Sequence, residues 1–561
     1  MRRLEPAAAA RAAGAAVRQT ADSLLGHPRA VVSGLIAANI AATALFALAV
    51  PHNGWVWYQG GDQIAYAADG ALVAGGHLPP ADLSWGWPFV LAPLSWVTGP
   101  TFVQMLPVLI TLQVLVLGPL ALLCVYALGT RIGGRLLGYW AMLLWVVAPY
   151  VSIPLFVGRY QGRYIDQVLP QSLGLSALAD YPSMVALIAC AALGARAIAR
   201  DSRSDALLVG LVLGFAIAIK PPNGLFTLGG GVAIALSRRW RAGFVVAAAV
   251  VPALVTLTVW KSRGLGHVPL FSLGETHLAA GIDRATTVAG IDFGKYVHVD
   301  VGHWQQEMDQ LREFFWSSRL VQWIPIAGLL AVARRSLPLA ALIGGWLASF
   351  VLVKGFSPAA SIESGSFWRL LMPAWPAYLL LLASVPLLVP TLAPRVGRRF
   401  STPPITTIGR RPAAVAVAAL AAVPLIGVLA LRPLGPQDAK PAVIQQIDGN
   451  ILLTVVDPGI KLTVGRSGNT RIVTWRAPNY GPKVFYRVYR TSNPRGDTRC
   501  ESSGGAGRCF LVSDVIATTR ATRYVDDSPP PSVAYRIGVG TNYLDDPSAG
   551  DVFVFSPEAG G

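Results

Sequence analysis

Charged residues are scarce in this chain of 561 amino acids: Asp, Glu, Lys and Arg together make up 13% of it, while apolar residues make up 53%. An ordinary soluble domain is about 25% charged, so this composition excludes a soluble enzyme and a disordered protein. Cysteine is also rare, and 4 cysteines are too few for a fold that depends on a disulfide framework. What the chain has is long apolar runs, which predict a polytopic α-helical membrane protein.

Eleven apolar segments can cross a membrane as helices. A transmembrane helix needs about 20 mostly apolar residues, and fewer where charged side chains at its ends reach the surface. The segments are 30–50, 101–128, 136–157, 182–199, 205–219, 223–236, 242–260, 319–333, 337–353, 370–391 and 412–431. The turn residues Pro221–Gly224 separate the two shortest segments and predict a tight helical hairpin. We therefore expect about 11 spans in a membrane domain of residues 30–431.

Arginines gather in every second loop, which sets the predicted orientation. The net charge of +17 would suit a nucleic-acid partner, but this alternation is typical of cytoplasmic loops under the positive-inside rule. We therefore expect no nucleic-acid partner, a cytoplasmic segment 1–29 and an uncleaved first span. The alternating topology indicates a plasma membrane. The Ala-, Arg- and Val-rich, Lys-poor usage is typical of a GC-rich bacterium such as an actinobacterium. The outward segments, which carry the carboxylates and histidines, are 51–100, 158–181, 261–318 and 354–369.

The chain changes character after the last span. Residues 433–561 contain short alternating runs separated by Gly, Pro, Asp and Ser, which predict an antiparallel β-sandwich outside the membrane. The runs around Val473–Trp475 and Tyr486–Tyr489 resemble those of a fibronectin type III domain. Cys500 and Cys509 flank a Gly/Ser-rich loop, and a disulfide between them suits an oxidising compartment. This domain is either a spacer or a module that binds carbohydrate or a partner.

The first outward loop contains a carboxylate at the start of a short helical pattern. Asp62 precedes Ile64–Val73, whose apolar and small residues repeat at helical spacing, so this helix is expected to lie along the membrane surface. Asp62 can cap the backbone amides there, or it can act chemically. The chain then passes Gly75–Gly76 and returns into the bilayer through an aromatic and proline-rich stretch, Pro79–Phe89.

This order of features resembles the GT-C superfamily of membrane glycosyltransferases, which includes protein mannosyltransferases, aminoarabinose transferases and arabinofuranosyltransferases. Asp62 matches the acidic position of their first loop, although Gln63 follows where the family often has Glu. Asp180 opens the fourth span, and Lys220 precedes the Pro-Pro turn. Arg369, in Ser366–Tyr378, matches the Arg-Tyr-Leu-Leu-Pro-x-x-Pro start of a late span. Together these features cover most of residues 30–391.

The resemblance implies an enzyme that moves a hexose or a pentose, with inversion, from a polyprenyl-phosphate donor to a cell-envelope glycan, lipid or protein. A carboxylate must accept the proton of the attacking hydroxyl, and Asp62 is the candidate base. Cations must stabilise the departing lipid phosphate. The candidates are Arg369, Lys220, Arg163 and Arg159. The alternative interpretation of these residues is that they only contact lipid headgroups. The supporting carboxylates, which can also align Mg²⁺ or Mn²⁺, are Asp180, Asp166 and Asp69. No cofactor is certain, and a helix N-cap explains Asp180 equally well.

The acceptor is expected to contact residues of the outward segments. The loop 261–318 contains four of the seven histidines, but none of them has the tight spacing of a zinc-binding helix. A structural role or contact with the acceptor is therefore a better expectation than a metal site. The candidate acceptor-binding residues are Trp85, Trp87, Glu275 and His277. Within the same loop, 304–316 has an apolar stripe and is expected to lie in the membrane interface.

Two other classes of function remain open. A transporter or flippase of lipid-linked saccharides would place ionisable groups at mid-bilayer on broken helices, often in repeated halves. The spans of this chain are nearly free of charge and show no convincing repeat, and only the break at Pro221–Gly224 suits a transporter. A non-catalytic scaffold, whose β-sandwich recruits envelope enzymes, is the other alternative.

Overall fold

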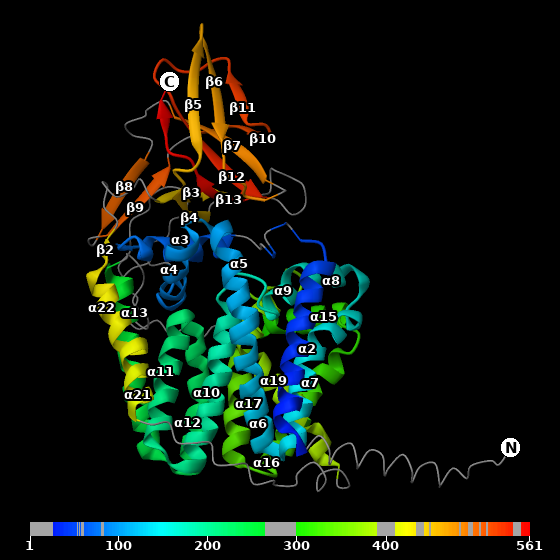
Figure 1. Cartoon of the computed structure of the whole chain (residues 1–561). Coiled ribbons are helices and arrows are strands. Elements are labelled where there is room, and N and C mark those ends of the chain that lie inside the picture. Colours follow the sequence, from blue (N-terminus) through cyan, green and yellow to red (C-terminus); the bar gives the residue numbers. More distant parts are fainter. Residues whose placement is uncertain are drawn as a thin grey trace, which may run out of the picture.

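The computed structural model describes residues 26–52, 54, 56–57, 61–79, 83–263, 299–389, 410–433, 442–447, 450–481, 484–491, 498–503, 506–511, 514–541 and 551–560. Helices form a bundle, and most of the strands gather over one end of it (Figure 1). The helices are α2 Pro28–Ala49, α3 Gly61–Ala74, α4 Gly86–Thr98, α5 Phe102–Leu112, η1 Gln113–Leu117, α6 Gly118–Gly133, α7 Arg135–Val151, η2 Ile153–Leu155, α8 Gly158–Arg163, η3 Tyr164–Val168, α9 Leu169–Ser172, α10 Asp180–Arg200, α11 Arg203–Ile219, η4 Pro221–Leu225, α12 Phe226–Ser237, α13 Trp240–Arg263, α15 Val301–Phe314, α16 Ser318–Ala333, α17 Leu337–Gly355, α18 Ser366–Leu371, η5 Met372–Ala374, α19 Trp375–Ser384, η6 Val385–Leu388, α21 Arg410–Val417, η7 Ala418–Ala422 and α22 Val423–Ala430.

The helices make this chain a membrane protein. In the described part, seven stretches are long and apolar enough to cross a membrane, namely Pro28–Ala49, Phe102–Gly133, Asp180–Arg200, Trp240–Lys261, Leu337–Gly355, Ser366–Leu388 and Arg411–Ala430. Two apolar helices are shorter, Arg135–Val151 and Ser318–Ala333. The predicted hairpin corresponds to α11 and α12, of 17 and 12 residues, joined by η4. All eleven predicted segments are largely helical, but the number of full spans stays a prediction.

Glycines allow the short helix α12 to pack closely on α17. A Cβ atom added to Gly229 would lie 2.6 Å from the backbone nitrogen of Trp346, and one added to Gly345 would lie 2.6 Å from Cα of Gly229. Membrane helices associate through such small residues, because close van der Waals contact replaces the hydrophobic driving force of water. This packing fixes α17, whose last turn lies at the end of the bundle that the strands cover (Figure 1).

The C-terminal strands form two sheets, which we call the β domain. They are β3 Ala442–Ile447, β4 Asn450–Val456, β5 Lys461–Ser467, β6 Thr470–Arg476, β7 Val484–Thr491, β8 Thr498–Ser503, β9 Ala506–Leu511, β10 Asp514–Thr519, β11 Arg523–Asp526, β12 Ala534–Thr541, β13 Asp551–Phe555 and β14 Ala559–Gly560. The nine-stranded sheet has the order β10-β7-β12-β13-β4-β3-β9-β8, with β14 beside β12, and the three-stranded sheet has the order β11-β6-β5. The rings of Trp475 and Tyr486 meet between the sheets, with centroids 5.4 Å apart.

The larger sheet corrects one expectation. It is not wholly antiparallel, because β13 pairs with β4, and β3 pairs with β9, in parallel. The hairpin β3–β4, which follows the helices in the chain, joins the sheet beside β13, the last strand but one. A sandwich of fibronectin type III type therefore stays a prediction. Cys500 and Cys509 lie directly opposite each other on β8 and β9, a backbone spacing that a disulfide can bridge; the disulfide itself also stays a prediction.

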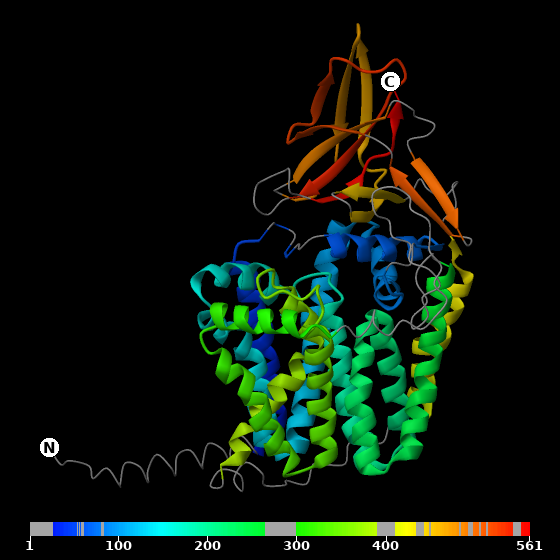
Figure 2. The ribbon, with the colours of Figure 1, turned by 180° about the vertical axis from the view of Figure 1, so that it is seen from behind.

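The β domain packs onto α3 at the end of the bundle (Figures 1 and 2). Ile64 of α3 and Ile460 and Tyr480 of the β domain belong to one buried apolar cluster. Strand β1, His77–Leu78, adds a second attachment, since it pairs in parallel with β2, Arg432–Pro433. The helix that carries Asp62 is thus held between the bundle and the β domain.

Candidate active site

Helix α3 places Asp62 beneath the β domain. Asp62 occupies the first turn of α3, and its side chain is 52% exposed. An aspartate at this position can cap backbone amides, but here its Oδ2 accepts a hydrogen bond from Nη2 of Arg369. Asp62 therefore faces a cation from a distant part of the chain and keeps an open side.

Arg369 also binds a second carboxylate. Its Nε donates to Oδ2 of Asp180 at 3.0 Å, and Nζ of Lys220 donates to Oδ1 of the same aspartate. Asp180 is the first residue of α10, and its side chain is 0% exposed. Asp62, Asp180, Lys220 and Arg369, which we call the charge cluster, thus come together from four separate segments. All four were predicted as site residues.

Local backbone geometry sets the positions of the two cations. Lys220 is extended, with φ −150° and ψ 111°, because the residue before a proline avoids the helical conformation. Helix α11 therefore ends at Ile219, and Lys220 lies at the break. Gly365 has φ 80°, which glycine adopts at little cost, and α18 begins directly after it. Arg369 is the fourth residue of that helix.

Burial separates the roles of the acidic groups. Asp180 is fully buried, and a buried carboxylate is stable only when it is paired and hydrogen-bonded. Tyr66 lies one turn after Asp62 on α3; burial, with the negative charges of Asp180 and Asp62, raises the pKa of Tyr66 far above its ordinary value. Tyr66 therefore stays protonated. Within the charge cluster, Asp62 is the carboxylate that an incoming substrate can reach.

Lys354 is a cation of this region that the sequence analysis did not identify. It lies in the last turn of α17, which contacts η4 and α18, and its charge and that of Lys220 repel each other. The side chain is half-buried, and no carboxylate of the described residues pairs with it. Its only sequence signal is a lysine at the end of a span, which is also typical of a residue that reaches for headgroups.

Gln63, which stands where the GT-C family often has Glu, connects α3 to the segment before α10. Its side chain is fully buried, and its Oε1 accepts from the backbone N–H of Ala177 at 2.6 Å. Nε1 of Trp87 donates to the carbonyl of Ala177 at 2.9 Å, and Nε2 of Gln113 donates to the carbonyl of Ser176 at 2.7 Å. Three side chains thus hold the backbone just before Asp180, so Gln63 has a positional role.

We expect Gln63→Glu to destabilise the protein. The amide Nε2 points to the carbonyl of Trp57 at 3.5 Å, and a carboxylate would place an acceptor against that acceptor in a buried site. Leaving such groups unsatisfied costs about 1–3 kcal/mol, and more for a charge. The thermal unfolding midpoint in detergent should fall for Gln63→Glu and stay unchanged for Gln167→Glu at an exposed position. An unchanged midpoint for both would contradict this role.

The structure gives Trp85 and Trp87 a packing role. Their side chains are 0% and 1% exposed, and the ring of Trp85 packs against Phe89 and Phe215 with centroids 5.6 and 6.3 Å away. Neither ring offers a surface to an acceptor here, contrary to the sequence-based expectation. Both residues stand where the chain returns into the bundle, Trp87 in the first turn of α4 and Trp85 directly before it, so helix packing buries their rings.

Arg159 and Arg163 on α8 bind other partners than the charge cluster. Arg159 pairs with Glu313, and its guanidinium lies 4.4 Å from the ring centroid of Phe314. Arg163 donates to the backbone carbonyl of Glu363, in the loop before α18. Both arginines are exposed, so they contact the surroundings of the site, and the cluster itself is built from Lys220 and Arg369.

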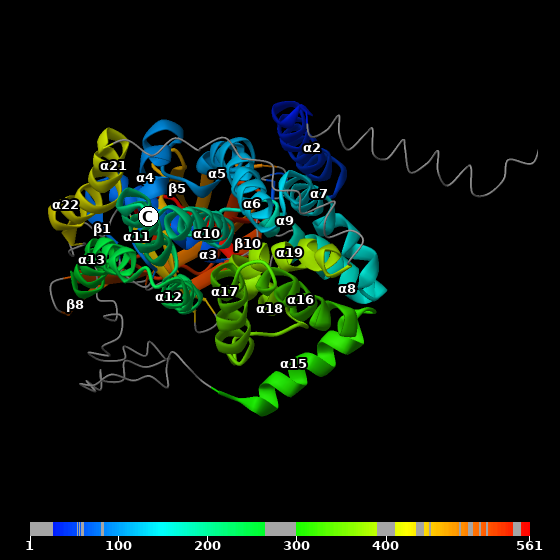
Figure 3. The same ribbon diagram turned by 90° about the horizontal axis from the view of Figure 1, so that it is seen from below.

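The remaining predicted residues lie elsewhere or outside the described part. Asp69 is buried two turns after Asp62 on α3, and Asp166 is half-buried on η3. Glu275 and His277 lie outside the described residues, so their acceptor contact stays a prediction. Amphipathic helix α15, which contains most of 304–316, lies across the edge of the bundle (Figures 2 and 3).

The charge cluster does not fit the divalent cation that the sequence suggested. Both carboxylate oxygens of Asp180 already bind cationic side chains, and Oδ2 of Asp62 binds Arg369. In the described ranges, no three His, Cys, Asp or Glu side chains lie close enough to hold a metal ion. We therefore assign no step to Mg²⁺ or Mn²⁺.

Fold and site together define an integral membrane protein with a charge cluster at the end of its helical bundle, beneath a β domain. Neither a protein-family model nor a curated protein matches the chain.

Among solved structures, the oligosaccharyltransferase of Archaeoglobus fulgidus is similar. For AglB in complex with an inhibitory peptide and a dolichol-phosphate, the TM-score is 0.38 at 13% identity, over 72% of this chain and 56% of that one. For the apo form, the TM-score is 0.35 at 14% identity, over 71% of this chain and 55% of that one. For the complex with zinc and sulfate, the TM-score is 0.35 at 12% identity, over 70% of this chain and 52% of that one. The chain thus spans little more than half the length of these proteins, and nothing about its chemistry follows from TM-scores this low.

Proposed function

We propose that this chain is an inverting membrane glycosyltransferase, which moves a hexose or a pentose from a polyprenyl-phosphate donor to a cell-envelope glycan, lipid or protein on the outer face of the bacterial plasma membrane. The observation that carries the proposal is Arg369, which joins the exposed Asp62 to the buried Asp180. A reachable base and fixed cations are what the reaction needs at one place.

The charges of the site suit a donor with one negative charge. Asp62 and Asp180 balance Lys220 and Arg369, and Lys354 adds a cation that has no carboxylate partner among the described residues. A polyprenyl-phosphate sugar is a phosphodiester with a single negative charge, so Lys354 could neutralise it. A half-buried lysine without a partner is costly unless an anion arrives.

Donor binding can also release the base. In the present structure Asp62 accepts from Nη2 of Arg369. A donor phosphate that binds this side of the guanidinium replaces Asp62 there, because two anions compete for the same donor group. The freed carboxylate then accepts the proton of the acceptor hydroxyl while the oxygen of that hydroxyl attacks the anomeric carbon. The bond from this carbon to the lipid phosphate breaks, and the phosphate departs towards Arg369 and Lys354.

A transfer assay with the purified full chain tests the proposal. We expect label to pass from a polyprenyl-phosphate radiolabelled sugar to an envelope-glycan acceptor, and not from a nucleotide sugar. Lys354→Met should weaken the apparent affinity for the donor by about tenfold, the effect of losing one charge-assisted contact. Arg334→Met, which removes an exposed cation that follows α16, serves as the matched control.

The same assay separates the alternatives. Lys220 lies at the break between α11 and α12, and a transporter also uses broken helices. If no donor supports transfer, but the protein moves a lipid-linked saccharide across liposome membranes, then it is a flippase and not a glycosyltransferase. Neither activity would favour the scaffold.

A further inference from the structure

The loop between α17 and α18, residues 356–365, connects two cations of the site. Helix α17 ends one residue after Lys354, and Arg369 is the fourth of the six residues of α18. The loop is packed against the protein, since Ala360 and Ile362 are 1% and 0% exposed. The position of this one segment therefore affects both cations.

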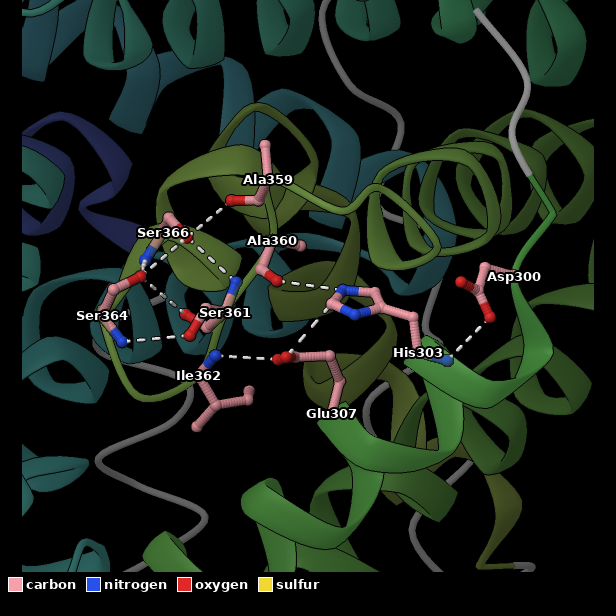
Figure 4. A network of polar contacts seen from close by, with 9 residues as sticks. All are labelled: Asp300, His303, Glu307, Ala359, Ala360, Ser361, Ile362, Ser364 and Ser366. Atoms are coloured by element: carbon pink, nitrogen blue, oxygen red, sulfur yellow. Dashed lines mark hydrogen bonds and ion pairs between the residues drawn. The ribbon is translucent and has the colours of Figure 1, made fainter. Parts of the chain in front are cut away.

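Side chains of α15 bind the backbone of this loop (Figure 4). Asp300 caps α15 by accepting from the backbone N–H of His303 at 2.9 Å. His303 and Glu307 are one turn apart and share a face of the helix. Oε2 of Glu307 accepts from the backbone N–H of Ile362 at 2.7 Å, and Nε2 of His303 lies 3.0 Å from the carbonyl oxygen of Ala360. A carbonyl only accepts, so Nε2 carries the hydrogen.

The contact passes directly to α18. Within the loop, the backbone N–H of Ser361 donates to Oγ of Ser366 at 2.9 Å, and this hydroxyl donates to the carbonyl of Ala359 at 2.8 Å. Ser366 is the first residue of α18. The backbone that α15 holds is therefore hydrogen-bonded to the start of the helix that carries Arg369.

Glu307 is an unusual residue for packing alone. Its side chain is 2% exposed, and His303 lies 3.9 Å from its Oε1. Burial raises the pKa of Glu307, which the hydrogen bond from Ile362 opposes. A buried carboxylate costs stability that an apolar side chain of similar size would not. The hydrogen bond of Glu307 to the N–H of Ile362 favours one position of the loop.

We infer that Glu307 and His303 are positioning residues, which hold the loop 356–365 and thereby set the places of Lys354 and Arg369 relative to the rest of the site. The structural part of this inference is independent of the reaction, whereas its consequence for lipid-phosphate binding rests on the proposed function.

Hydrogen–deuterium exchange of the full-length protein in detergent tests the structural part. Glu307→Ala removes the acceptor of the Ile362 amide, and we expect exchange in peptides covering 357–366 to accelerate by about tenfold. Glu307→Gln keeps an acceptor oxygen and should remain within about threefold of the wild type. Asp309→Ala, on the exposed side of α15, should leave the loop unchanged. Equal exchange in the wild type and Glu307→Ala would overturn the inference.

Binding of farnesyl phosphate, a short polyprenyl monophosphate, tests the consequence. Glu307→Ala should weaken its binding by about tenfold or more, because a small displacement of positioned groups is costly, while Glu307→Gln should bind nearly as the wild type does. Loss of binding in both variants would show that the charge of Glu307 itself is needed and would overturn a positioning role. If Glu307→Ala exchanged faster but bound farnesyl phosphate as the wild type does, the positioning role would also be overturned. A wild-type protein that binds no lipid phosphate would instead overturn the proposed function, and the exchange experiment would still decide whether α15 holds the loop.

Discussion

Asp62→Asn will lower the rate of sugar transfer by about 10²–10⁴-fold, the usual contribution of a general base, while the protein stays folded and still binds lipid phosphate. The amide retains the size of the carboxylate and can accept a hydrogen bond from Arg369, but it cannot take a proton from the acceptor hydroxyl. The fully buried Asp180 keeps both of its cationic partners, so the remainder of the charge cluster should persist. The measurement is single-turnover transfer from a polyprenyl-phosphate radiolabelled sugar, with farnesyl phosphate binding measured in parallel.

Asp201→Asn is the matched control for this prediction. Asp201 also pairs with an arginine, Arg239, and its side chain is 55% exposed, close to the exposure of Asp62. It lies in the turn after α10, at the opposite end of that helix from Asp180. Transfer by Asp201→Asn should therefore equal that of the wild type. If Asp62→Asn retained most of the wild-type rate, Asp62 would not be the base, and the outer loops would have to supply another carboxylate.

The sequence predicted the parts of this molecule that depend on local pattern. Apolar runs of sufficient length became helices, the small-residue pattern after Asp62 became α3, and the prolines after Lys220 ended α11. The predicted cluster residues came together because each of them stands at a helix end or break, and those ends lie at the same side of the bundle.

Partners that are distant in the chain could not be predicted in this way. Arg159, Arg163 and Arg369 all read as arginines near the membrane surface, and what distinguishes them is a partner 154, 200 or 307 residues away. The role of Gln63 depends on the backbone of Ala177, 114 residues away. Lys354 has no motif, and only the packing of α17 against η4, which follows Lys220, makes it a candidate.

Arg369→Lys should lower the rate of sugar transfer by at least about 10²-fold, almost as much as removal of the base, although the substitution preserves the positive charge. A guanidinium can donate from Nε to Asp180 and from Nη2 to Asp62 at the same time, because its donors form a planar fork. An ammonium is a compact point charge on a flexible chain and cannot span both carboxylates in that geometry. We expect both weaker farnesyl phosphate binding and a lower single-turnover rate, since Arg369 is proposed to contact the phosphate before and during its departure.

Stability measurements distinguish this catalytic loss from a failure to fold. With Arg369→Lys, Asp180 keeps Lys220 and gains a second ammonium nearby, so the thermal unfolding midpoint should change little. With Arg369→Ala, the buried carboxylate loses one of its two cations but keeps Lys220, so the midpoint should fall, by less than the about 3–5 kcal/mol that a buried charge without any partner costs. Arg490→Lys provides the control for the exchange of arginine for lysine itself. Arg490 makes two hydrogen bonds to carboxylate oxygens, as Arg369 does, but both are to Asp526 and lie within the β domain. Full transfer by Arg369→Lys would contradict the proposed site, since it would show that charge alone, without the bridge between Asp62 and Asp180, is sufficient.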